Sequence, residues 1–296
     1  MSPVSAERAG RIVAVDAYSV GVSVWLPSVG RALRGLATQP SLPLPACYLL
    51  DARGRPALRA EVPRVAPLPA CKKLAHEALD AALARARTVS TPGSTAAASA
   101  PPASPDADAA PVAVAAFDAA ALEAAARDAL EQTGFPFERA GPGFAVHVDG
   151  GAAPSTRVEV SRGEAGLRAR IERSLRLATP SCLHAMARYA LELNHRLRFA
   201  RVAVDGTAFD VAHVVWDAVL PEALPLARTL GGAIEAVAVA RAVSNDVFTA
   251  LADERVAQAY LRLRFADDAS LAPPARTAPV RPPTPRAYAA LPGVGP

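Results

Sequence analysis

A low-complexity segment at residues 88–116, rich in alanine, proline and serine, divides this 296-residue chain. It holds too few large apolar side chains to offset the entropy of ordering its backbone, so a flexible linker is predicted there. The last 28 residues, 269–296, contain eight prolines and are predicted to form a disordered tail. Folded structure is therefore expected in two blocks, 1–87 and 117–268.

The second block shows clear helix and strand signals. Asp118 and Gly134 are placed as an N-cap and a C-terminal glycine, which predicts a helix over 118–133. Apolar residues then alternate with polar ones in three predicted strands, around 144–148, 157–160 and 167–172. Gly-rich turns separate these strands, as in an antiparallel meander.

Thr179 and Pro180 begin another predicted helix, as a cap and a first-turn proline. A strand pair at 201–205 and 208–216 is expected to turn at Asp205–Gly206. Two further helices are predicted, one beginning near Pro225 and one over 253–265. The block is therefore predicted to be α+β, with an antiparallel sheet, helices packed on one face, and the order α-βββ-α-ββ-αα.

The first block is predicted to be a small β-β-β-α unit. Residues 11–26 alternate loosely, residues 46–62 indicate a hairpin turning at 51–54, and residues 70–87 indicate an alanine-rich helix. This order could be an incomplete copy of the second block, although no residue-level repeat establishes it. A block this short has a marginal core, so we expect it to dock on the second block or on a second subunit.

The element order, the length of about 150 residues and one sequence run resemble the bacterial type III secretion chaperone-like fold, including its YbjN-related members. The run is Leu183-x-x-Met186-Ala187-x-x-Ala190-Leu191-x-Leu193-Asn194, followed by the strand Arg201-Val202-Ala203-Val204-Asp205-Gly206. The resemblance covers residues 117–268. It implies a non-enzymatic binding domain, often dimeric, that holds partner segments against its sheet and helices. Dedicated secretion chaperones are small, acidic and stand-alone, whereas this chain adds an N-terminal block, a linker and a proline-rich tail.

Two apolar sets are the candidate partner surfaces. The helix after Thr179 carries a stripe that could belong to the core or to a dimer seam, and the core is favoured. The strand 167–171, with Leu167 and Ile171, is the candidate edge for a partner. The stripe consists of Leu183, Met186, Ala190, Leu193 and Leu197.

Arg168, Arg170 and Arg176 share one face of an extended segment and could contact an anion, although a solvated face is favoured. The chain's basic excess lies elsewhere, because residues 1–90 carry 12 Lys or Arg against six Asp or Glu, and residues 117–268 carry 17 against 20. Nucleic acid is therefore not the favoured partner.

The spacing of reactive residues predicts no catalytic set, cofactor or metal. His184 and His195 lie about 16 Å apart along one predicted helix, too far to share an ion. The three cysteines have unrelated spacings, which disfavours a disulfide framework. Neither a secretory signal nor a membrane-spanning stretch is predicted, so the expected location is cytoplasmic.

The sequence therefore favours a non-enzymatic protein-binding or adaptor module whose partner is another protein or a second copy, as a homodimer. Two alternatives stay open. A nucleic-acid-associated protein would use the basic first block and the arginine strand, and an enzyme of unidentified activity would need a polar cluster that spacing does not reveal.

Overall fold

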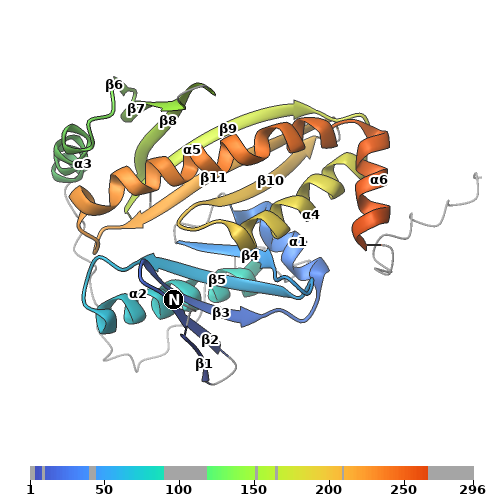
Figure 1. Ribbon diagram of the computed structural model, residues 1–296, viewed down its shortest axis with the longest axis horizontal. Coiled ribbons are helices and arrows are strands. Elements are labelled where there is room, and N and C mark those ends of the chain that lie inside the picture. The colour runs from blue at the N-terminus through green and yellow to red at the C-terminus, as the bar shows by residue number, and fades with distance from the viewer. Residues whose placement is uncertain are drawn as a thin grey trace, which may run out of the picture.

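Two antiparallel sheets and six helices form the part of the chain that the computed structural model describes, namely residues 4–8, 11–39, 45–89, 119–150, 153–163, 166–208 and 210–265 (Figure 1). The α+β class with antiparallel sheets is therefore confirmed. Most of the predicted linker and the whole predicted tail lie outside the described residues. The predicted linker begins two residues early, because the preceding helix continues to Val89.

The first half of the structure, residues 4–89, contains sheet A. Its strand order is β1-β2-β3-β5-β4. In chain order, its elements are β1 (Val4–Arg8), β2 (Arg11–Val15), β3 (Ser19–Trp25), α1 (Val29–Thr38), β4 (Ala46–Leu50), β5 (Pro56–Pro63) and α2 (Leu68–Val89).

The prediction for this half was right about the hairpin and the last helix, but it missed β1 and α1. It also merged β2 with β3. Asp16 separates those two strands, because its carboxylate accepts hydrogen bonds from the backbone amides of Tyr18 (2.8 Å) and Ser19 (2.6 Å). Helix α1 has only ten residues, and its two glycines, Gly30 and Gly35, weaken the sequence signal for a helix.

The second half, residues 119–265, contains sheet B, with the strand order β10-β11-β9-β8-β7-β6. The added strand β6 is the main departure from the predicted order. In chain order, the elements are α3 (Ala119–Thr133), β6 (Phe137–Ala140), β7 (Gly143–Gly150), β8 (Ala153–Gly163), β9 (Gly166–Arg176), α4 (Pro180–Arg196), β10 (Arg201–Ala208), β11 (Val211–Pro221), α5 (Leu226–Leu251) and α6 (Glu254–Phe265).

The predicted hairpin turn at Asp205–Gly206 is wrong. Asp205 pairs with His213 and Ala208 with Val211, so β10 continues beyond Gly206. Gly206 instead permits close packing, because a Cβ at this position would lie 2.5 Å from Cδ2 of Leu183 on α4.

The two halves share one topology. Without β6, α3 and α6, each half reads βββ-α-ββ-α, and the strand orders β1-β2-β3-β5-β4 and β7-β8-β9-β11-β10 correspond one to one. Helix α1 thus corresponds to α4, and α2 to α5. The first half is therefore a complete topological copy of the βββ-α-ββ-α part of the second half, where the sequence indicated an incomplete one.

Helices cover one face of each sheet, which we call its inner face; the opposite face is its outer face. Helix α2 packs on β3 and β5, and α5 packs on β11 and β9 (Figure 1). Most buried apolar side chains of both halves join in one hydrophobic cluster that runs from Val20 to Ala257, and a small separate cluster in the first half consists of Cys47, Leu49 and Ala57. At its centre in the second half, the indole of Trp216 donates to the Ser244 hydroxyl (2.9 Å) and packs edge-on against Phe248.

Candidate functional site

The apolar stripe on α4 lies inside the protein's own fold. Met186, Ala190 and Leu193 are buried, and Leu183 and Leu197 are half-buried. Helix α4 packs on β10 of its own half and also on β4 and α1 of the first half. The stripe is therefore core, and this helix forms a seam between the two halves of one chain.

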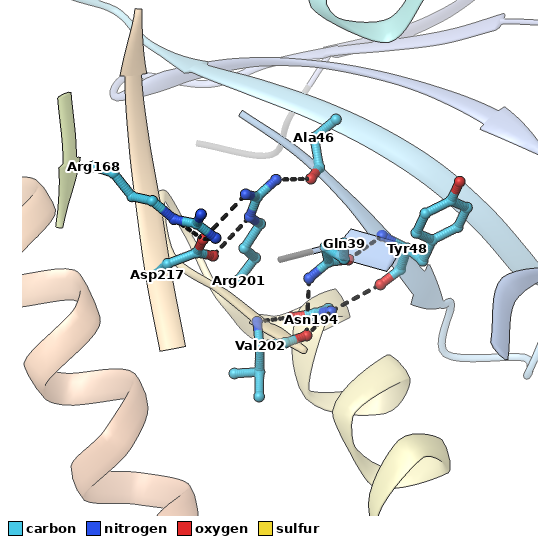
Figure 2. Close-up of polar contacts among 8 residues, drawn as sticks. All are labelled: Gln39, Ala46, Tyr48, Arg168, Asn194, Arg201, Val202 and Asp217. Atoms are coloured by element: carbon cyan, nitrogen blue, oxygen red, sulfur yellow. Dashed lines mark hydrogen bonds and ion pairs between the residues drawn. The ribbon is translucent and has the colours of Figure 1, made fainter. Parts of the chain in front are cut away.

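Two side-chain amides bridge the edge strands at this junction of the halves. The Gln39 amide accepts from the backbone N–H of Tyr48 (2.9 Å) and donates to the carbonyl of Val202 (2.9 Å). The Asn194 amide accepts from the N–H of Val202 (2.7 Å) and donates to the carbonyls of Tyr48 and Val202 (both 2.9 Å). Figure 2 shows both amides lying between the two strands.

These bonds have a consequence for partner binding. Strands β4 and β10 are terminal strands of their sheets, and each therefore carries backbone groups without a neighbouring strand. Gln39 and Asn194 satisfy such groups at Tyr48 and Val202, and the two edges face each other. The junction is thus sealed by the chain itself.

A buried ion cluster lies beside the junction. Arg201 donates to the Asp217 carboxylate (2.7 Å) and to the carbonyl of Ala46 in the first half (2.7 Å), and Arg168 donates to the same carboxylate (2.6 Å; Figure 2). The side chains of Asp217 and Arg201 are only 1% and 4% exposed. Burial lowers the pKa of the Arg168 guanidinium, although Asp217 acts in the opposite direction.

The three arginines proposed as an anion contact do not form one site. Arg168 is held by Asp217, and Arg170 donates to Glu172 (2.5 Å). Arg176 is exposed at the far end of β9, eight residues from Arg168, which corresponds to roughly 27 Å in a strand. The densest basic run therefore offers less unpaired charge than its composition suggests.

The prediction that strand 167–171 forms a partner edge is wrong. These residues belong to β9, which is paired with β11 on one side and β8 on the other. Leu167 and Ile171 are buried in the core cluster. The sequence signal failed because an alternating pattern reports that one face is buried, and it carries no information about a strand's place in its sheet.

His213 on β11 has two polar neighbours that could take part in catalysis. The Ser174 hydroxyl (3.1 Å) and the Glu172 carboxylate (3.2 Å) both contact Nδ1 of the His213 ring. A nucleophile–base–acid relay needs the hydroxyl and the carboxylate on different ring nitrogens, so this contact is not such a relay.

Among the residues the structure places, no group of three or more His, Cys, Asp or Glu side chains could hold an ion. The three cysteines, Cys47, Cys71 and Cys182, are buried free thiols. Burial raises the pKa of the Cys47 thiol, which makes it a poorer nucleophile. Of the helices in the described ranges, none is long and apolar enough to cross a membrane.

Helix α5 carries an exposed row of three valines, which the sequence pattern did not predict. Val239, Val243 and Val247 lie one turn apart on the solvent side of α5 and are 58%, 59% and 38% exposed. We call these three residues the valine stripe. The sequence does contain the signal, a repeat of valine every four residues, but it lies beside the buried stripe of Leu230, Ala233 and Val237 and was not separated from it.

The corresponding helix of the first half, α2, is charged on its solvent side. The solvent side of α2 carries Lys72, Lys73, Glu77 and Asp80, all exposed. Both helices cover the inner face of a sheet with the same topology. Packing against the sheet therefore does not demand an apolar outer side, and the valine stripe needs another explanation.

Comparison with known proteins gives no assignment: no family model matches this chain, and no curated protein matches it either.

Proposed function

We propose that this chain is a non-enzymatic protein-binding module, related to the type III secretion chaperone-like and YbjN-like fold, and that the valine stripe on α5 is its binding surface. The observation that carries this proposal is the exposure of three valines in register on one helix face. An apolar patch that stays in contact with water is a common mark of a protein interface.

Valine has a lower helix propensity than lysine or glutamate, so three exposed valines do not stabilise α5 as a helix. Covering them with an apolar partner would remove nonpolar surface from water, at roughly 25 cal/mol per Å². The charged residues at the matching face of α2 gain nothing comparable.

Site-specific photo-crosslinking in the native host would test the proposal. A photoreactive amino acid replaces Val243 in one variant and Ala81, an exposed residue of α2, in the control. We expect a discrete crosslinked polypeptide from α5 and none from α2. The crosslink should disappear when Val239→Glu is added and persist when Lys73→Glu is added instead. Equal crosslinking from both helices, or from neither, would contradict the proposal.

A further inference from the structure

From the junction we infer that this chain is a fused dimer, in which the first half permanently occupies the surface on which a second copy of the second half would otherwise bind. The inference concerns the α1, β4, α4 and β10 surfaces and is independent of the valine stripe. The partner of this surface is a copy of the same βββ-α-ββ-α fold, and it is carried in the same chain.

The contacts between the halves are reciprocal, as in a two-fold symmetric dimer. Helix α1 of the first half packs on β10 of the second, and α4 of the second half packs on β4 of the first. The two corresponding helices, α1 and α4, also pack on each other. In a two-fold symmetric interface, an element either packs on its own counterpart or makes a contact that is repeated by the two corresponding elements.

The amides at the junction repeat this symmetry at the level of single atoms. Each lies at the end of its helix, Gln39 just after α1 and Asn194 near the end of α4. Each accepts a hydrogen bond from the strand of its own half and donates one to a carbonyl of the other half. Tyr48 and Val202, the strand residues that they bind, therefore occupy equivalent positions.

This equivalence extends to the neighbouring strands and reveals one important difference between the halves. Next to Tyr48, Cys47 lies opposite Arg59, and next to Val202, Arg201 lies opposite Asp217. Arg59 and Asp217 are thus equivalent positions with opposite charge. Arg59 donates to the carbonyls of Asn194 (2.7 Å) and Leu197 (2.9 Å), which lie at the C-terminal end of α4.

The charge difference explains why unlike halves pair. The carbonyl end of a helix carries a partial negative charge, so a guanidinium there is favourable. If two copies of the second half paired in the same way, Asp217, which Arg201 and Arg168 bind within its own half, would take the place of Arg59, and the carbonyls at the end of α4 would lose their guanidinium donor. The first half supplies the guanidinium that donates to these carbonyls, and a like pair of second halves, which lacks these hydrogen bonds, is disfavoured.

Cleavage of the full chain tests the inference. A protease site is inserted within residues 90–118, and the mass of the particle is measured by light scattering before and after cutting. We expect one chain before cutting, and after cutting a one-to-one complex of the two fragments. Separation of the wild-type fragments, or a homodimer of the C-terminal fragment, would overturn the inference.

Charge reversal at the junction then tests its specificity. Arg59→Asp should weaken the association of the cut fragments at least tenfold, whereas the control Arg53→Asp, in the exposed β4–β5 turn, should not change it. The tether keeps the halves together before cutting, so circular dichroism of the uncut variant shows whether it folds. If Arg59→Asp does not fold, Arg59→Gln replaces it with the same expectation. Equal association of the Arg59 and Arg53 variants would overturn the assignment of Arg59.

Discussion

The fully buried side chain of Asn194 forms hydrogen bonds with three backbone groups of two strands. Leaving a buried donor or acceptor without a partner costs about 1–3 kcal/mol. We therefore expect Asn194→Ala to lower the free energy of unfolding by about 3 kcal/mol, measured by denaturant titration. Gln132→Ala, on the exposed side of α3, is the matched control and should change it by less than about 0.5 kcal/mol. Similar effects for the two variants would contradict the bridging role of Asn194.

Gly35 on α1 makes a second residue-scale prediction. A Cβ there would lie 2.2 Å from Cζ of the Tyr48 ring. In the second half the residue four positions before the bridging amide is Ala190, and the equivalent of Tyr48 is the smaller Val202. Gly35→Ala alone should destabilise the protein by about 1–3 kcal/mol through overpacking.

Copying the second half's pair should remove this conflict. Gly35→Ala should cost much less in a Tyr48→Val background than in the wild type, and a double-mutant cycle measures the difference. Additive effects of the two substitutions would show that the ring and the helix do not meet as described.

At the scale of single elements, the turn between β4 and β5 depends on Asp51. Burial acts to raise the pKa of this carboxyl, but hydrogen bonds from the Arg55 and Arg53 amides (2.8 and 2.9 Å) and from the Arg55 side chain (2.8 Å) outweigh it, so the pKa is lowered. A carboxyl with a lowered pKa stabilises the fold above its unfolded pKa, about 3.9, and loses that contribution as the pH falls through its folded pKa.

Asp51→Ala should therefore cost about 1–2 kcal/mol at pH 7. The difference in the free energy of unfolding between this variant and the wild type should become smaller as the pH falls below about 4. Unfolding curves at pH 7, 5 and 3.5 measure this dependence. A gap of the same size at all three values would mean that the ionised form of Asp51 contributes nothing specific.

The elements that the sequence predicted are those whose signals are local. The hairpin around Asp51 has its turn residues in place, and α4 has its proline at the first turn. The missed elements depend on distant partners. Strand β6 has four residues and gains its order by pairing with β7, and α1 is held between β4, β10 and α4. Tertiary packing, rather than propensity, makes these segments ordered.

In the candidate site too, local patterns were predictable from the sequence and contacts between distant residues were not. The stripe on α4 was readable because helical periodicity reports a buried face. Its burial against the first half was not readable, because the two halves share topology without a visible sequence repeat. Likewise, the arginines of β9 were visible, but Asp217, which holds Arg168, is 49 residues away in the chain.

At the scale of the whole molecule, the continuous core predicts that both halves unfold together. The chain has two tryptophans, Trp25 in β3 of the first half and Trp216 in β11 of the second. Trp216→Phe and Trp25→Phe give two proteins that each report on one half. We expect fluorescence from both to follow transitions whose midpoints coincide, after correction for the stability change of each substitution.

Separate transitions would show that the halves unfold independently in spite of their shared cluster. The same pair of proteins also locates local damage, because a substitution in the first half, such as Leu58→Ala, should shift the signal of Trp216 as much as that of Trp25. Cavity formation at a buried leucine costs about 2–5 kcal/mol, which is large enough to measure.

The burial of all three cysteines makes the native chain a convenient background for labelling. Thiol reagents should modify Cys47, Cys71 and Cys182 only after the protein opens locally. The rate at which each thiol is modified would then report how often its region opens. A new cysteine introduced on the solvent side of α5 would react at once with a fluorophore or spin label. Distances and binding at that helix could then be followed without removing a single natural thiol.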